Sequence, residues 1–128
     1  MKMINKNVTD RMKDYFTASI QLDVRMFEGI YASEFESVRT DLKGQLILIS
    51  REQLLHKVLQ LKEQKLSLPG LNKIELLGIS EYGDICSLLY RMVKGEEQAI
   101  HHYVWQQTDN QYFMVRQFTV EQDLTYLL

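Results

Sequence analysis

The second half of the chain is a series of strand-like segments with no helical segment between them. It runs from about Leu71 to Gln122, and its breaks are short and rich in turn-forming residues. The breaks fall at residues 81–84, 94–97 and 108–110, which predicts four strands joined by hairpins. Helical patterns occupy the first half. This order predicts an α+β fold in which N-terminal helices pack on one face of an antiparallel sheet.

The whole chain, residues 1–128, is predicted to form a single domain, because 128 residues leave no room for a second core. Fifteen basic and seventeen acidic side chains are interspersed and give a net charge of -2, which argues against nucleic acid as a partner. No apolar run is long enough for a signal peptide or a membrane span, so we expect no membrane association and a cytoplasmic location. The single cysteine, Cys86, fits a reducing compartment.

Helical spacing of apolar residues predicts a first helix from about Val8 to Gln21. Its apolar side would carry residues such as Met12 and Tyr15, and its polar side would include Arg11. Asp23 then offers a side chain that can cap the start of a second helix, from Val24 to Tyr31.

A first strand is predicted from Phe35 to Asp41, with a short strand at Leu46–Ile49. Ser50 and Gln53 have the spacing of a capping box, which predicts a third helix from about Arg51 to Lys65. Its apolar face would include Leu54, Val58 and Leu59. Pro69-Gly70 ends the helical region.

The segments 85–93 and 112–115 are apolar on both sides of the predicted sheet. Helices can cover only one of these faces in so short a chain. We therefore favour a homodimer packed through the outer face of the sheet, although single apolar residues are also common on protein surfaces.

The turn at residues 108–110 decides which side chains share a face. A two-residue Asp109-Asn110 loop would place Tyr103 opposite Arg116. A three-residue loop would place Tyr103 opposite Val115 and His101 opposite Gln117, and we prefer this register. Across the Gly95 turn, His101 would then neighbour Tyr90, and Trp105 would neighbour Cys86.

One face of the sheet thereby collects aromatic and polar side chains that suit the wall of a small-molecule pocket. The candidates for ligand binding are Tyr15 on the first helix and, on the strands, Tyr90, His101, Tyr103, Trp105 and Gln117. The same composition is typical of an ordinary core in which tyrosines reach a hydrogen-bond partner.

The order of these parts resembles the nuclear transport factor 2-like superfamily, which includes SnoaL-like cyclases and ketosteroid isomerases. The resemblance covers nearly the whole chain. It rests on Tyr15-Phe16 with Asp23, on residues 30–35, on Gly44 before the helix at Ser50, on residues 81–86, and on residues 103–105 leading into 112–115.

The resemblance implies a cone-shaped domain, with a curved sheet wrapped around the first helix, a cavity between them and frequent dimerisation through the outer face. It also implies that Val115, Gln117 and Thr119 face inward. Isomerases of the fold use a tyrosine on the first helix as a hydrogen-bond donor, and Tyr15 is the similar position. Their catalytic carboxylates have no clear counterpart in this sequence.

Catalytic candidates are therefore few. Asp23 or His101 could act as a general base, with Tyr15 or Tyr90 as donor, and such a reaction would need no cofactor. The structural alternatives are that Asp23 caps the second helix and that His101 lies on a partly solvated strand. Cys86 fits a buried thiol better than a nucleophile. No metal site is predicted, since no paired histidines or cysteine cluster occurs.

Three functions remain open. The first is a domain that binds a small, largely apolar molecule between the first helix and the sheet. The second is a cofactor-free isomerase, dehydratase or cyclase. The third is a non-catalytic association module in which core side chains close the cavity.

Overall fold

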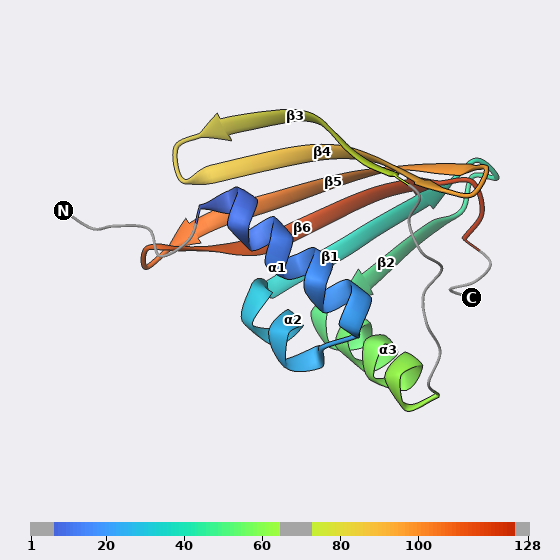
Figure 1. Cartoon of the computed structure of the whole chain (residues 1–128), viewed down its shortest axis with the longest axis horizontal. Coiled ribbons are helices and arrows are strands. Elements are labelled where there is room, and N and C mark those ends of the chain that lie inside the picture. Colours follow the sequence, from blue (N-terminus) through green and yellow to red (C-terminus); the bar gives the residue numbers. More distant parts are fainter. Residues whose placement is uncertain (1–6, 65–72, 125–128) are drawn as a thin grey trace.

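The computed structural model describes residues 7–64 and 73–124, which form three helices and six strands (Figure 1). The predicted helix end at Lys65 and the Pro69-Gly70 break lie outside these residues. In chain order the elements are α1 Val8–Gln21, α2 Val24–Ile30, β1 Tyr31–Asp41, β2 Leu46–Ser50, α3 Arg51–Glu63, β3 Lys73–Tyr82, β4 Ile85–Lys94, β5 Glu97–Thr108 and β6 Gln111–Glu121.

The six strands form one open sheet in the order β2-β1-β6-β5-β4-β3. Strands β3 to β6 form the predicted antiparallel meander. The predicted sheet was antiparallel throughout, whereas β1 pairs with β6 in parallel, so the sheet is mixed. The helices lie on one side of this sheet (Figure 1). We call that side the inner face and the opposite side the outer face.

Helix α1 has the predicted bounds because both of its ends are capped. The Asn7 side chain accepts a hydrogen bond from the backbone N–H of Asp10 at 2.8 Å. Leu22 ends the helix in the left-handed conformation, with φ 51°. Arg11 was predicted to face solvent, but it is buried, because its guanidinium reaches carbonyl groups of two other elements.

The starts of α2 and α3 also agree with the sequence. The carboxylate of Asp23 accepts a hydrogen bond from the Met26 backbone, and Ser50 with Gln53 forms the predicted capping box. Three details differ. Helix α2 ends at Ile30, the first strand begins at Tyr31 rather than Phe35, and Leu59 on α3 is exposed.

The hairpin between β5 and β6 differs from both predicted registers. Its loop has two residues, Asp109 and Asn110, both with positive φ, so the preferred three-residue loop is wrong. A bulge at Val115 then shifts the pairing by one residue. Tyr103 consequently lies opposite Gln117, and His101 lies opposite Thr119.

Across the Gly95 turn the predicted pairs are confirmed, with Tyr90 opposite His101 and Cys86 opposite Trp105. Gln117 and Thr119 are buried on the inner face, as the resemblance implied. Before the bulge the buried residue of β6 is Met114 rather than Val115. Among the described residues, none of the helices has the length and apolar character needed to cross a membrane.

Candidate functional site

The six predicted ligand-binding residues all lie at the inner face and are all buried. Tyr15 comes from α1, and the others come from adjacent strands of the meander. Their exposed fractions range from 0% to 8%, for Tyr15, Tyr90, His101, Tyr103, Trp105 and Gln117. The sequence therefore identified side chains that belong to one region of the fold.

Aromatic rings fill the space between α1 and the middle of the sheet. The ring centroids of Tyr15 and Tyr103 are 5.1 Å apart, and those of Tyr90 and Tyr103 are 5.8 Å apart. Phe16 packs edge-on against Tyr90 at 5.6 Å. These contacts give the region the character of a core, with Tyr90 as its boundary toward β3.

Two buried tyrosines at this site are poor acids. Burial raises the pKa of Tyr31 and of Tyr103 well above the ordinary value, and the neighbouring Tyr15 raises both further. Tyr15 is also hydrogen-bonded to each of them. The hydroxyl groups of Tyr31 and Tyr103 thus remain protonated and act as neutral hydrogen-bonding groups.

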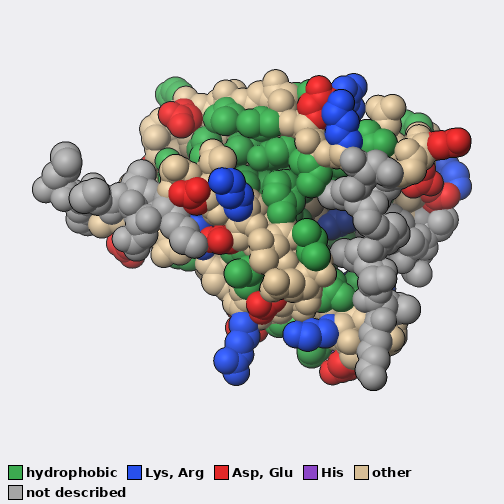
Figure 2. Space-filling view, viewed as in Figure 1, with side chains coloured by type: hydrophobic (Ala, Val, Ile, Leu, Met, Phe, Trp, Pro, Cys, Tyr) green, Lys and Arg blue, Asp and Glu red, His purple; other side chains and the backbone are tan. Residues whose placement is uncertain are grey.

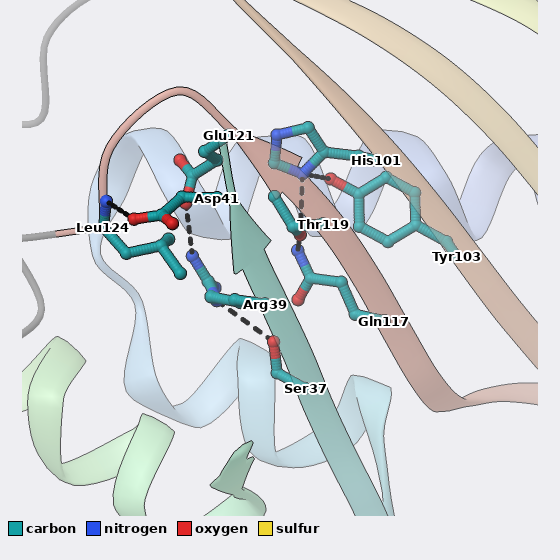
Figure 3. Close-up of polar contacts among 9 residues, drawn as sticks. All are labelled: Ser37, Arg39, Asp41, His101, Tyr103, Gln117, Thr119, Glu121 and Leu124. Atoms are coloured by element: carbon teal, nitrogen blue, oxygen red, sulfur yellow. Dashed lines mark hydrogen bonds and ion pairs between the residues drawn. The ribbon is translucent and has the colours of Figure 1, made fainter. Parts of the chain in front are cut away.

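A chain of polar contacts lies next to the tyrosines (Figure 3). Nδ1 of His101 lies 3.3 Å from the Tyr103 hydroxyl and 3.4 Å from the Thr119 hydroxyl. His101 is therefore a buried member of a side-chain cluster, and the alternative of a partly solvated strand position is wrong.

Gln117 adds a buried acceptor to this cluster. Its Nε2 lies 3.5 Å from the Thr119 hydroxyl. Within residues 7–64 and 73–124, its Oε1 has no hydrogen-bond partner. Buried carbonyl oxygens normally have a partner, so the Oε1 atom of Gln117 is an exception within this cluster.

Asp23 does not join this site. Its carboxylate is half-buried at the start of α2, where it accepts the hydrogen bond from Met26 at 3.1 Å. The cap therefore accounts for this residue, as the structural alternative predicted. Cys86 is a poor nucleophile, because burial raises the pKa of its thiol and the charge of Glu81 raises it further.

A second cluster of polar side chains lies on the inner face, near the ends of β1 and β6 (Figure 3). Nε of Arg39 donates to the Ser37 hydroxyl at 3.1 Å, and Arg39 pairs with Glu121 at 4.0 Å. The Asp41 carboxylate accepts three backbone hydrogen bonds, from Lys43, Gln45 and Leu124, at 2.9 to 3.1 Å. Asp41 thereby joins the β1–β2 turn to the segment after β6.

This bonding makes the stability of the fold depend on pH. Burial raises the pKa of Asp41, but the three backbone hydrogen bonds outweigh it and leave the pKa below its ordinary value. The carboxylate therefore stabilises the fold above its unfolded-state pKa of about 3.9. This contribution is lost as the pH falls through the lower folded-state value.

Asp41→Asn is accordingly expected to lower the thermal unfolding midpoint by several degrees at pH 7 and by much less at pH 3. The measurement is thermal unfolding followed by circular dichroism at both pH values. Glu96→Gln, in the exposed turn before β5, is the control and should show no such pH-dependent difference. An equal Asp41→Asn effect at both pH values would contradict this role for the carboxylate.

Strand β3 lies at the edge of the sheet, away from α1 (Figure 1). It carries exposed apolar side chains on the inner face. Ile74, Leu76 and Ile79 lie opposite the buried Met92, Tyr90 and Leu88 of β4, so they share the inner face with them. They are 40%, 45% and 47% exposed. We call these three residues the β3 strip, and Figure 2 shows hydrophobic side chains gathered over β3 and β4 beside α1.

The outer face carries a second exposed apolar set. One line of directly paired residues crosses five adjacent strands, and we call it the outer row: Leu48, Val38, Phe118, His102 and Leu89. Leu48, Phe118 and Leu89 are exposed, and the other two are half-buried. The neighbouring line adds Leu46 and Val120, which are also exposed.

Solved structures of other proteins share this arrangement. A nuclear transport factor 2-like protein of unknown function from Silicibacter pomeroyi superposes with a TM-score of 0.72, at 16% identity, over 90% of this chain and 92% of that chain. One from Shewanella baltica gives a TM-score of 0.69 at 11% identity, with 91% of each chain covered. One from Cytophaga hutchinsonii gives 0.67 at 13%, over 89% and 94%.

The chain has the nuclear transport factor 2-like fold. No protein-family model and no curated protein match its sequence. At these identities the likeness concerns the fold alone, and the fold expected from the resemblance is confirmed.

The chain has a hollow of about 290 Å³ on the outer side of the irregular pairing between β1 and β6. It contains none of the six predicted ligand-binding residues. Its lining consists of Tyr31, Ala32, Ser33, Glu34, Gln106, Thr108, Phe113 and Val115.

Sequence reasoning did not identify the β3 strip as part of a candidate site. The available signal was the alternation of Ile74, Leu76 and Ile79, which is interrupted at Leu77. Their exposure could not be predicted, because it depends on how far α1 extends across the sheet.

Proposed function

We propose that this chain is a small-molecule-binding domain whose ligand has a largely apolar body and lies on the β3 strip. Tyr90 and Phe16 form the boundary of this position toward α1. The predicted residues Tyr15, His101, Tyr103, Trp105 and Gln117 form the buried layer behind Tyr90.

One observation carries the proposal, namely that three branched apolar side chains on the inner face remain almost half exposed. Covering such surface stabilises a complex by about 25 cal/mol per Å². Tyr90, which lies opposite Leu76 of the β3 strip, supplies a polar group of the kind found in ligand sites. Of the two predicted general bases of the enzyme alternative, Asp23 caps α2, and His101 is buried against the Tyr103 and Thr119 hydroxyls, away from the β3 strip.

The test uses 1-anilinonaphthalene-8-sulfonate as an apolar probe, with binding followed by fluorescence. Leu76→Gln combined with Ile79→Gln is expected to weaken binding about tenfold, which corresponds to ~1.4 kcal/mol of lost contact. The matched control is Ile20→Gln with Leu42→Gln, two exposed apolar residues that lie outside both the β3 strip and the outer row. Equal affinities in the two double variants would refute the proposed position.

A second function is favoured by the outer row, which fits an association surface. We propose that the chain forms a homodimer through this face. The support is a line of directly paired residues that crosses five strands and in which every member except His102 is apolar. Exposed apolar surface of this kind usually marks an interface.

Phe118→Arg places a charge in the middle of the outer row. We expect the mass measured by sedimentation equilibrium to fall to half that of the wild type. Ile20→Arg, at an exposed position on α1, should leave the mass unchanged. An unchanged mass in Phe118→Arg would contradict dimerisation through the outer face.

A cytoplasmic location remains part of the proposal, supported by the single cysteine, which is buried and unpaired with another cysteine. The proposed partners are an apolar small molecule and a second copy of the chain. Nucleic acid and membranes are not among them, given the interspersed charges and the net charge of -2.

A further inference from the structure

Strand β3 forms one edge of the open sheet, and its sequence suits an internal strand. The described residues place no strand beside its free edge. Nine of its ten residues are exposed. Its apolar side chains lie on both faces, since the β3 strip faces inward and Tyr82, opposite Ile85, faces outward. Edge strands this long and apolar are templates for pairing with a further strand.

The opposite edge of the sheet is different. Strand β2 has only five residues, and α3 begins directly after it. Short edges are poor templates. On β3 the charges that could discourage pairing are Lys73, Glu75 and Glu81, and Glu75 is bound by Arg91 of β4.

We propose that β3 pairs with β3 of a second copy, antiparallel, about a two-fold axis between Leu77 and Gly78. This register uses all ten residues and places Lys73 opposite Tyr82 of the partner copy. The inner residues Leu76 and Ile79 then lie opposite each other, as do Ile74 and Glu81.

Because of the bulge at Leu77, this register pairs only residues that lie on the same face of the sheet. The bulge reverses the alternation of the strand, so that Ile74 and Leu76 face inward before it, and Ile79 and Glu81 face inward after it. Every pair in the proposed register therefore joins two residues of the same face, as an antiparallel ladder requires. Moving the partner by one residue would join inner to outer residues.

The charges agree with a second copy as the partner. Neither Glu75 nor Glu81 lies opposite another carboxylate, because their partners are Ser80 and Ile74. The Lys73 side chain lies opposite the exposed ring of Tyr82, where a cation–π contact can form. The contact is the same in both directions, so the assembly closes at two copies along this edge.

This pairing would also extend the proposed ligand-binding surface, an inference that rests on the proposed function. Directly opposed side chains of an antiparallel pair lie about 5 Å apart at Cβ. The β3 strips of the two copies would therefore form one continuous apolar surface. Each copy would contribute three side chains to the binding surface of the other.

The test is disulfide cross-linking in a Cys86→Ala background that carries Leu76→Cys and Ile79→Cys. Both new cysteines face inward. The proposed register brings position 76 of each copy opposite position 79 of the other. The control carries Leu76→Cys and Ser80→Cys, which lie on opposite faces and cannot meet in this register. Both proteins are oxidised with copper phenanthroline at micromolar concentration and compared on a non-reducing gel.

We expect the first protein to form a single band at twice the chain mass, at least tenfold faster than the control. No band, equal rates, or a ladder of higher multiples would overturn the proposal. The cross-link is measured without probe, so its failure leaves the probe titration as an independent test of the ligand position. A positive cross-link with no probe binding would support the pairing and refute the ligand position.

Discussion

Trp105→Ala is expected to lower the free energy of unfolding by about 3–5 kcal/mol. Trp105 is fully buried on β5, opposite Cys86. Its indole N–H donates to the sulfur of Met12 at 3.3 Å, and the guanidinium of Arg11 lies 5.8 Å from the ring. Alanine would remove the ring and leave a cavity between α1 and the sheet.

The measurement is urea unfolding followed by far-ultraviolet circular dichroism, because Trp105 is the only tryptophan and its fluorescence would be lost. Trp105→Phe keeps most of the ring volume and should lower the free energy of unfolding by clearly less than Trp105→Ala. A loss below about 1 kcal/mol for the alanine variant would contradict a tightly packed α1–sheet contact.

Arg11→Met is expected to lower the free energy of unfolding by about 2–4 kcal/mol, since it leaves two partly buried backbone hydrogen bonds without their donor. Nε of Arg11 donates to the carbonyl oxygen of Tyr112 at 2.9 Å, and NH2 donates to that of Gly29 at 2.8 Å. Arg11 thereby connects α1 with β6 and with the last turn of α2. A cation near the end of a helix is also favoured by the helix dipole.

Urea unfolding again provides the measurement, and Arg11→Lys is the matched control. Lysine keeps the charge but cannot present two donors in the geometry of a guanidinium, so its loss should be intermediate. Wild-type stability in Arg11→Met would show that methionine packing replaces the polar contacts fully.

Arg11 also illustrates why part of the fold could not be predicted. The 3.6-residue period gave α1 its correct bounds, because its apolar residues and the turn at Leu22 are local features. The partners of Arg11 are 18 and 101 residues away in the chain. A helical pattern alone therefore assigns an arginine to the solvent side.

Some strand pairings could likewise be predicted from local features, and others could not. The Gly95 turn gave the β4–β5 register correctly, since a short turn determines which residues are opposed. At the next hairpin the bulge at Val115 compensates for the two-residue loop, and no local signal indicates a bulge there. The parallel pairing of β1 with β6 joins distant segments, so turn chemistry could not reveal it.

The sequence predicted which residues form the candidate site, but it did not predict that they are buried. His101, Tyr103 and Gln117 were placed on the correct face despite the wrong loop, because the loop error and the bulge offset each other. Their burial beneath α1 depends on ring packing that a sequence does not reveal. The exposed strip lies instead on β3, one strand beyond Tyr90.

The ligand position on the β3 strip is tested most directly by nuclear magnetic resonance of the isoleucine δ1-methyl groups during titration with 1-anilinonaphthalene-8-sulfonate. We expect the signals of Ile74 and Ile79 to shift with a common binding curve. The signals of Ile85 and Ile100, on the outer face, should stay in place. Shifts confined to Ile85 and Ile100, or none at Ile74 and Ile79, would contradict a ligand position on the inner face of β3.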